Sequence, residues 1–152
     1  MLLLKFQIGS SAYAVDSARV EEVVPWVQLR PVPHAPAYLP GVFHYRGKVI
    51  PVVDLGLLLG SDAAFNRLST RIMVVRTNQQ GVRLLGLLAS RVSDLVRVDA
   101  GKLQPAAVQL SQARYLGKVA ETPEGLVQIL NVDHVLPEHL VPEAVNKLEG
   151  PI

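Results

Sequence analysis

Residues 39–55 read LPGVFHYRGKVIPVVDL, and this stretch places an arginine between aromatic residues and a glycine, directly before an apolar run that ends at an aspartate and a leucine. Gly47 allows a backbone conformation or a close approach that a side chain would hinder. The run over residues 48–55 is rich in β-branched residues, which favour strands. The stretch therefore predicts a strand, with Arg46 at the corner that leads into it from a short helical turn.

Short apolar runs recur along the rest of the chain, separated by glycine, proline or polar turns. Runs of about five to eight residues with this punctuation are typical of all-β barrels and sandwiches. The predicted strands are residues 2–8, 13–15, 48–55, 71–75, 82–89 and 126–132.

Helical signals are few. Pro142 suits the first position of a helix, Val145 and Leu148 follow at helical spacing, and Gly150 is a stop signal, so we expect a C-terminal helix that caps a barrel. A short turn or helix is also expected over residues 36–43, where a proline at position 40 limits its length.

The chain carries an internal repeat. A shift of 77 positions aligns apolar residues of the segment 38–59 with those of 115–136 in the same order, and a shift of 72 positions aligns residues 20–24 with 92–96. Two similar halves of about five short strands each suggest two small barrels packed together, because closing a sheet removes its exposed edges. We expect a groove where the barrels meet.

Composition indicates a globular protein. Of 152 residues, 49% are apolar and 18% are charged, which is too hydrophobic for a disordered chain. The net charge is +2 and the basic residues are scattered singly, so we predict no nucleic-acid partner. The absence of cysteine excludes disulfides and zinc-thiolate sites, and no apolar run has the length needed to span a bilayer. We therefore predict a cytoplasmic protein that is not inserted directly into a membrane.

Residues typical of catalysis are sparse. The sequence contains neither the Gly-x-Ser-x-Gly elbow of hydrolases nor a phosphate-binding P-loop. Glu21 and Glu22 are adjacent acids, which is common at a solvated strand edge. The best local set of metal-ligating residue types is Asp133, His134, Glu138 and His139. These features leave one alternative open, a small-molecule or metal-binding β-barrel or a minor hydrolase; otherwise we predict no catalytic residues, cofactor or metal.

The stretch 39–55 resembles the signature of the CheW-like family of chemosensory coupling proteins. It has a glycine, an Arg-Gly pair, a proline and an aspartate at the family's spacing, here Gly41, Arg46, Gly47, Pro51 and Asp54. Other segments of the sequence also match the family pattern, in the same order, from about residue 4 to residue 136. Two departures from the pattern are the His-Tyr pair at 44–45, where the family usually has Asn-Leu, and a serine at position 90, where aspartate is common.

This resemblance implies a fold of mainly β structure, with two SH3-like five-stranded barrels packed side by side, a few short helices and the C-terminal helix. Residues 1–152 would then form a single CheW-like domain, and the boundary between its halves is undefined in chain order because strands can be exchanged between them.

The resemblance also implies a non-catalytic adaptor in chemotaxis signal transduction. Such a scaffold joins the cytoplasmic tip of a methyl-accepting chemoreceptor to the regulatory domain of a chemotaxis-type histidine kinase, in receptor arrays at the inner face of the membrane. Pseudo-symmetric barrels that pair with a homologue would also allow self-association. A remaining alternative within the family is a coupling domain cut from a larger kinase.

The interface residues that the resemblance implies are Val20, Glu22, Gly41 and Arg46. For Arg46 two roles stay open: its guanidinium can bind a nearby carboxylate and fix the local corner, or it can contact the receptor. The residues Gly47, Pro51 and Asp54 are expected to be structural, with Asp54 accepting a turn hydrogen bond at the strand end. Four apolar residues have a plainer interpretation, as ordinary core positions: Val20, Val23, Val92 and Leu95.

Overall fold

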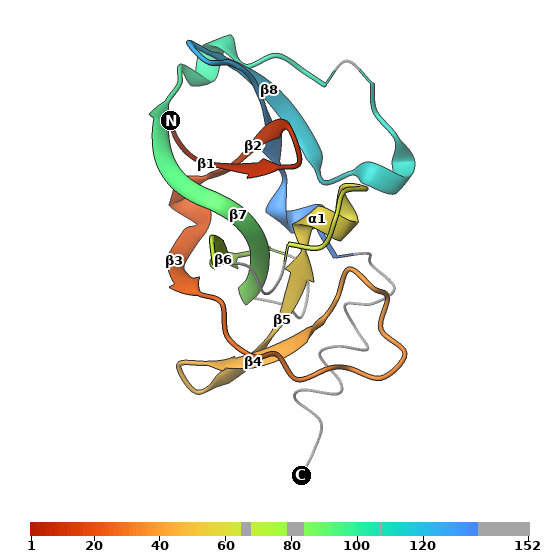
Figure 1. Cartoon of the computed structure of the whole chain (residues 1–152). Coiled ribbons are helices and arrows are strands. Elements are labelled where there is room, and N and C mark those ends of the chain that lie inside the picture. The colour runs from red at the N-terminus through yellow and green to blue at the C-terminus, as the bar shows by residue number, and fades with distance from the viewer. Residues whose placement is uncertain (65–67, 79–83, 107, 137–152) are drawn as a thin grey trace.

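The computed structural model describes residues 1–64, 68–78, 84–106 and 108–136, and these form a mainly β fold (Figure 1). The strands are β1 (Leu2–Ile8), β2 (Ser11–Asp16), β3 (Val20–Pro25), β4 (Gly41–Tyr45), β5 (Lys48–Asp54), β6 (Thr70–Arg76), β7 (Leu84–Arg97), β8 (Leu116–Thr122) and β9 (Gly125–Leu130). The helical segments are α1 (Leu55–Leu58) and four 3-10 turns, Ser17–Arg19, Ala100–Lys102, Ser111–Ala113 and Val132–His134. Within the described residues, no helix is long and apolar enough to cross a bilayer.

The strands form two five-stranded halves that share the long strand β7. In the lower half of Figure 1 the order is β4-β5-β7-β6-β3, and in the upper half it is β7-β1-β2-β9-β8. The first part of β7 pairs with β5 and β6, and its last part pairs with β1. Each half curls so that its two ends meet. The segment after β3 forms an isolated bridge to β4, between Arg30 and Val42, and the segment after β7 forms one to β8, between Gln104 and Val119.

The internal repeat has a counterpart in the backbone. The hairpin β4–β5 corresponds to β8–β9, and each inner hairpin strand pairs in parallel with a strand of its own half. The amide of Asp54 donates to the carbonyl of Tyr38 at 2.7 Å, and 77 positions later the amide of Asn131 donates to the carbonyl of Tyr115 at the same distance. The aligned apolar residues therefore mark two copies of one supersecondary unit.

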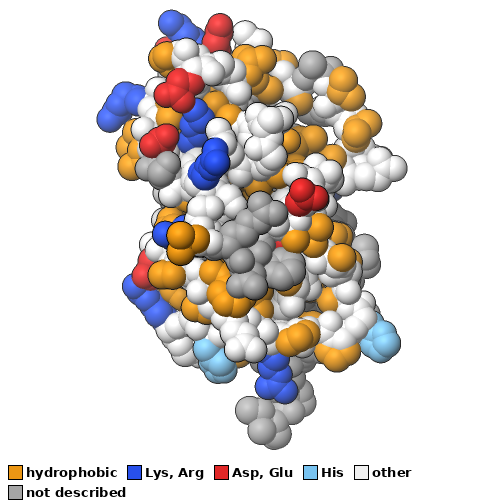
Figure 2. Space-filling view, in the orientation of Figure 1, with side chains coloured by type: hydrophobic (Ala, Val, Ile, Leu, Met, Phe, Trp, Pro, Cys, Tyr) orange, Lys and Arg blue, Asp and Glu red, His pale blue; other side chains and the backbone are white. Residues whose placement is uncertain are grey.

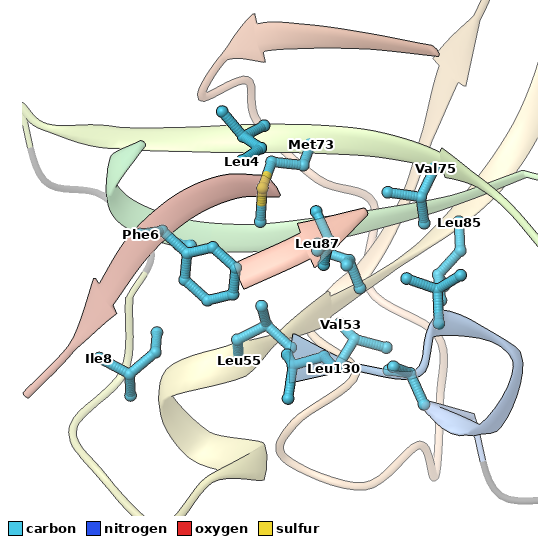
Figure 3. Close-up of a cluster of buried hydrophobic side chains, with 14 of the residues drawn as sticks. Leu4, Phe6, Ile8, Val53, Leu55, Met73, Val75, Leu85, Leu87 and Leu130 are labelled. Carbon is cyan, nitrogen blue, oxygen red and sulfur yellow. The ribbon is translucent and has the colours of Figure 1, made fainter. Parts of the chain in front are cut away.

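The core has three parts. One barrel interior is formed by Phe43, Tyr45, Ile50, Val52, Ala64, Ile72, Val74 and Leu88, and the smaller one by Leu3, Ala14, Ala120 and Val127. The largest cluster lies between the halves, and we call it the central cluster. Figure 3 labels ten of its side chains, which converge there: Leu4, Phe6, Ile8, Val53, Leu55, Met73, Val75, Leu85, Leu87 and Leu130.

Neighbouring residues of one strand serve different parts of this core. Val52 faces a barrel interior and Val53 the central cluster, and Leu3 and Leu4 divide in the same way. Successive side chains of a strand point to opposite faces, so a strand packed on both sides must be apolar throughout. This explains why the sequence shows continuous apolar runs where a half-exposed sheet would alternate.

The structure corrects several sequence predictions. Strands β3, β4 and β8 were not among the predicted runs, and β7 continues eight residues past the predicted end at residue 89. Residues 36–39 form a turn, closed by the amide of Leu39 on the carbonyl of Pro36 at 2.9 Å, but residues 41–43 are strand, so the expectation of a helix there is wrong. Pro40 supplies no amide hydrogen for a helix. The predicted C-terminal helix lies outside the described residues.

Candidate functional site

The hairpin between β4 and β5 turns on two residues, Arg46 and Gly47. Both have positive φ angles, 48° and 80°, and Tyr45 pairs with Lys48 across the turn. Two left-handed residues match the right-handed twist of the flanking strands, which is why tight hairpins use such turns. The corner at Arg46 is therefore a strand-to-strand hairpin, and the expected helix-to-strand corner is wrong.

The tip of this hairpin contacts β3. The hydroxyl of Tyr45 donates to Glu22 Oε1 at 2.7 Å, and a terminal nitrogen of Arg46 donates to the same oxygen at 2.8 Å. The guanidinium of Arg46 also lies 5.4 Å from the centre of the Tyr45 ring, within the range of a cation–π interaction. The structure thus brings together Glu22 and Arg46, two of the predicted interface residues. We call Glu22, Tyr45 and Arg46 the hairpin-tip cluster.

The hairpin-tip cluster is accessible from solvent. The side chain of Arg46 is 70% exposed and that of Glu22 39% exposed, while the ring of Tyr45 is buried in a barrel interior. The hydrogen bond to Glu22, with partial desolvation, raises the pKa of Tyr45, so its hydroxyl stays a neutral donor at physiological pH. An exposed ion pair adds only about 0–1 kcal/mol to stability, so the cluster presents a fixed charged surface more than it stabilises the fold.

The other two predicted interface residues support the fold around this cluster. A Cβ atom on Gly41 would lie 2.3 Å from the carbonyl oxygen of Arg30, so glycine is required for the bridge that curls this half. Val20 is half-buried against the central core. In this structure neither residue belongs to the hairpin-tip cluster.

The three signature residues Gly47, Pro51 and Asp54 hold structural positions. Pro51 pairs with Val42 on one side of β5, and the ladder to β7 on the other side starts one residue later, which accommodates the missing amide hydrogen. The buried carboxylate of Asp54 accepts from the amide of Leu57 at 3.2 Å and, with both oxygens, from the amide of Ala64 at 3.0 Å. It caps α1 and fixes the loop that follows.

The sequence analysis did not predict Tyr45 as a site residue, and it interpreted Val23 and Leu95 as core residues. Phe43 and Tyr45 alternate along β4 and both point inward, a pattern that could have placed the tyrosine hydroxyl at the rim of a barrel. Val23 is 38% exposed and Leu95 is 61% exposed, so their interpretation as core residues is wrong. They are equivalent under the 72-residue shift, and Val92, like Val20, packs partly buried on the central core.

Comparison with known proteins identifies the family. The sequence-family model described as CheW-like domain matches residues 2–139. This chain belongs to the CheW-like domain family. The resemblance drawn from residues 39–55 is therefore confirmed.

Relatives agree with this assignment. The chain is 37% identical over 103 residues to the chemotaxis protein CheW of Rhizobium meliloti, covering 68% of this chain and 64% of that protein. It is 32% identical over 132 residues to the chemotaxis protein CheW of Helicobacter pylori, covering 86% of this chain and 78% of that protein. The crystal structure of the scaffolding protein TtCheW from Thermoanaerobacter tengcongensis matches with a TM-score of 0.79 at 23% identity, over 90% of this chain and 89% of that one. These comparisons confirm the predicted fold and favour the adaptor over the metal-binding or hydrolytic alternative.

The CheW-like chain gives little support to the metal alternative. Glu138 and His139 lie outside the described residues, and among the residues that are described no group of three or more His, Asp or Glu side chains could hold a metal ion. The carboxylate of Asp133 is engaged by the guanidinium of Arg19 through both oxygens and by the amide of Asn78 at 2.6 Å.

The surface charge is mixed. On the face in view in Figure 2, acidic and basic side chains are interspersed, without a continuous basic surface.

The pairing of Asp133 predicts an acid-dependent loss of stability. Partial burial alone would raise the pKa of Asp133, but the hydrogen bonds from Arg19 and the Asn78 amide and the charge of Arg19 outweigh it, so the pKa is lowered. A carboxyl whose pKa is lower in the folded state stabilises the fold above its unfolded pKa, and this contribution disappears as pH falls through the folded value. We expect Asp133→Asn to lower the free energy of unfolding by about 1–2 kcal/mol at pH 7, and by much less near pH 3. Urea titrations at both pH values measure this, and an equal loss at both would contradict it.

Proposed function

We propose that this CheW-like chain is a non-catalytic adaptor that couples methyl-accepting chemoreceptors to a chemotaxis-type histidine kinase. The observation that carries the proposal is the hairpin-tip cluster, in which the signature arginine is held by Glu22 and Tyr45 and still exposes most of its side chain. An arginine fixed in this way offers the remaining donors of its planar group to a partner. Arginine is also enriched among the residues that dominate binding energy at protein interfaces.

The two like halves give the adaptor two like surfaces. Val23 on β3 and Leu95 on β7 occupy equivalent positions of the repeat, and both expose apolar side chains. Exposed apolar side chains beside charged ones suit a surface that is covered when a partner binds. We assign the hairpin-tip cluster and adjacent β3 to the receptor, and we assign an edge of either half to pairing with the kinase regulatory domain or with a second copy of the chain.

Residues 1–152 act in this proposal as one unit, because β7 belongs to both halves and no cut within it leaves either half complete. The adaptor works in the cytoplasm and is recruited to receptor arrays at the inner face of the membrane. It binds no nucleic acid and requires no cofactor.

The experiment that tests the proposal titrates the purified chain separately with a receptor-tip fragment and with the regulatory domain of a co-encoded histidine kinase. We expect both to bind, with dissociation constants on the order of micromolar, and a ternary complex to form when all three are mixed. Light scattering of the chain alone gives its self-association. If neither fragment binds while all the proteins are folded, the adaptor proposal is wrong.

A further inference from the structure

A second feature of the molecule is a polar cleft of about 240 Å³, separate from the hairpin-tip cluster. It lies where β7 passes from one half to the other, since Ser90 pairs with Thr70 of β6 and with Gln7 of β1. Its side chains come from β1, β7 and the loop after α1. The polar ones are Gln7, Ser61, Asp62, Ser69, Ser90 and Arg91.

The walls of the cleft approach one another closely at two glycines. A Cβ atom on Gly56 would lie 2.0 Å from the carbonyl oxygen of Asp62, and one on Gly9 would lie 3.2 Å from Ser61 Oγ. The buried carboxylate of Asp54 binds the amide of Ala64 and so anchors the same loop. The loop that carries Ser61 and Asp62 is thus positioned by the fold, and a preformed cleft spares a ligand the cost of ordering it.

Two opposite charges line this small cleft without forming an ion pair. The guanidinium of Arg91 has one side-chain partner among the described residues, the neutral Gln7 Oε1 at 3.3 Å, and over the same residues Asp62 makes no ion pair. Arg91 also has a φ angle of 53°, a conformation that a non-glycine residue adopts at a cost and that is found preferentially at functional sites. The side chain of Arg91 therefore borders the cleft without a carboxylate partner among the described residues.

We propose that this cleft binds a small zwitterion of the free amino acid class. The ligand carboxylate accepts hydrogen bonds from Arg91, its ammonium group donates to Asp62, and the serine hydroxyls complete the polar contacts. A simple anion would be repelled by Asp62, and a simple cation by Arg91, so a ligand with both charges is the better match. The volume is below the usual range of about 300–1,000 Å³ for drug-sized ligands, which restricts the occupant to small molecules. This binding site goes beyond the proposed adaptor function and does not depend on it.

The test is a set of titrations of the full chain, followed by amide chemical shifts, with L-alanine, acetate and ethylammonium at matched ionic strength. We expect L-alanine to bind with a dissociation constant on the order of millimolar, and each singly charged probe to bind at least about tenfold more weakly. The shift changes should concentrate at residues 7–9, 61–64 and 90–91. Binding of acetate as strong as that of L-alanine would overturn the zwitterion assignment, and an absence of L-alanine binding would overturn the site.

Substitutions locate the two charges. Arg91→Gln and Asp62→Asn should each weaken L-alanine binding at least about tenfold. The matched controls are Arg97→Gln and Asp94→Asn, which make the same changes at exposed positions of β7 that do not line the cleft, and these should leave the affinity unchanged. The amide spectrum of each variant reports its fold, and because Asp62 lies in a loop, Asp62→Asn tests the site even if Arg91→Gln unfolds the protein. A folded Asp62→Asn variant with unchanged affinity would contradict the proposal.

Discussion

Replacing Arg46 with glutamate should weaken binding of the receptor-tip fragment at least about tenfold. The substitution removes an exposed guanidinium and places a second carboxylate beside Glu22, whose oxygen now accepts from Arg46 at 2.8 Å. Like charges at this distance repel, so the hairpin tip would reverse its charge and lose the ion pair to β3, while the hydrogen bond from Tyr45 to Glu22 would remain. Isothermal titration with wild-type protein and variant side by side measures the change.

The control for this prediction is Lys102→Glu. Lys102 is exposed, it lies in a 3-10 turn of the other half, and its reversal changes the net charge by the same amount. It should leave receptor affinity unchanged. Unaltered affinity of a folded Arg46→Glu variant would contradict a role of the hairpin tip in receptor binding.

The charge-swapped double variant Glu22→Arg with Arg46→Glu separates the two roles of Arg46. The swap restores an ion pair at the hairpin tip but reverses the sign of the charge that a partner meets. Recovery of affinity would assign Arg46 to fixing the hairpin, whereas persistent loss would assign it to direct contact. Exposed pairs contribute little to folding stability, so a difference between the single and double variants reports on binding.

The architecture was largely predictable because the apolar pattern is local. Residues 48–55 read as one strand, since β5 is packed on both faces, and the 77-residue shift aligned this hairpin with the second one. The missed strands β3 and β8 alternate charged and apolar residues or expose much of their surface. The parallel pairing of β2 with β9 joins residues more than 110 positions apart, and no local pattern encodes such a contact.

The candidate site was predictable only in part. The family resemblance indicated Glu22 and Arg46, but the contacts between these side chains depend on the strand register. Glu22 contacts Tyr45 and Arg46 from a strand whose register shifts between Val20 and Glu22, and such an irregularity changes which side chains share a face. A one-residue slip would turn the carboxylate to the opposite face. The opposed charges of the polar cleft come from two segments about thirty residues apart and could not be paired from the sequence.

Among the substitutions proposed, the largest effect on stability is expected at Asp54. Asp54→Ala removes the cap of α1 and leaves the amide of Ala64 buried without its acceptor. Loss of a cap costs about 1 kcal/mol and an unsatisfied buried donor about 1–3 kcal/mol, so we expect the free energy of unfolding to fall by about 2–4 kcal/mol. Urea titration followed by fluorescence of the single tryptophan, Trp26, measures the loss.

Two further variants show whether this loss comes from the buried contacts. Asp99 caps a 3-10 turn through the amide of Gly101 at 2.9 Å but is exposed, so Asp99→Ala should cost no more than about 1 kcal/mol. Asp54→Asn keeps Oδ1, the oxygen that accepts from both Leu57 and Ala64, and should therefore cost less than Asp54→Ala. Equal losses for Asp54→Ala and Asp99→Ala would contradict the assignment of Asp54 as anchor of the loop. If the assignment holds, Asp54→Ala should also weaken L-alanine binding, because the anchored loop carries Ser61 and Asp62 of the cleft.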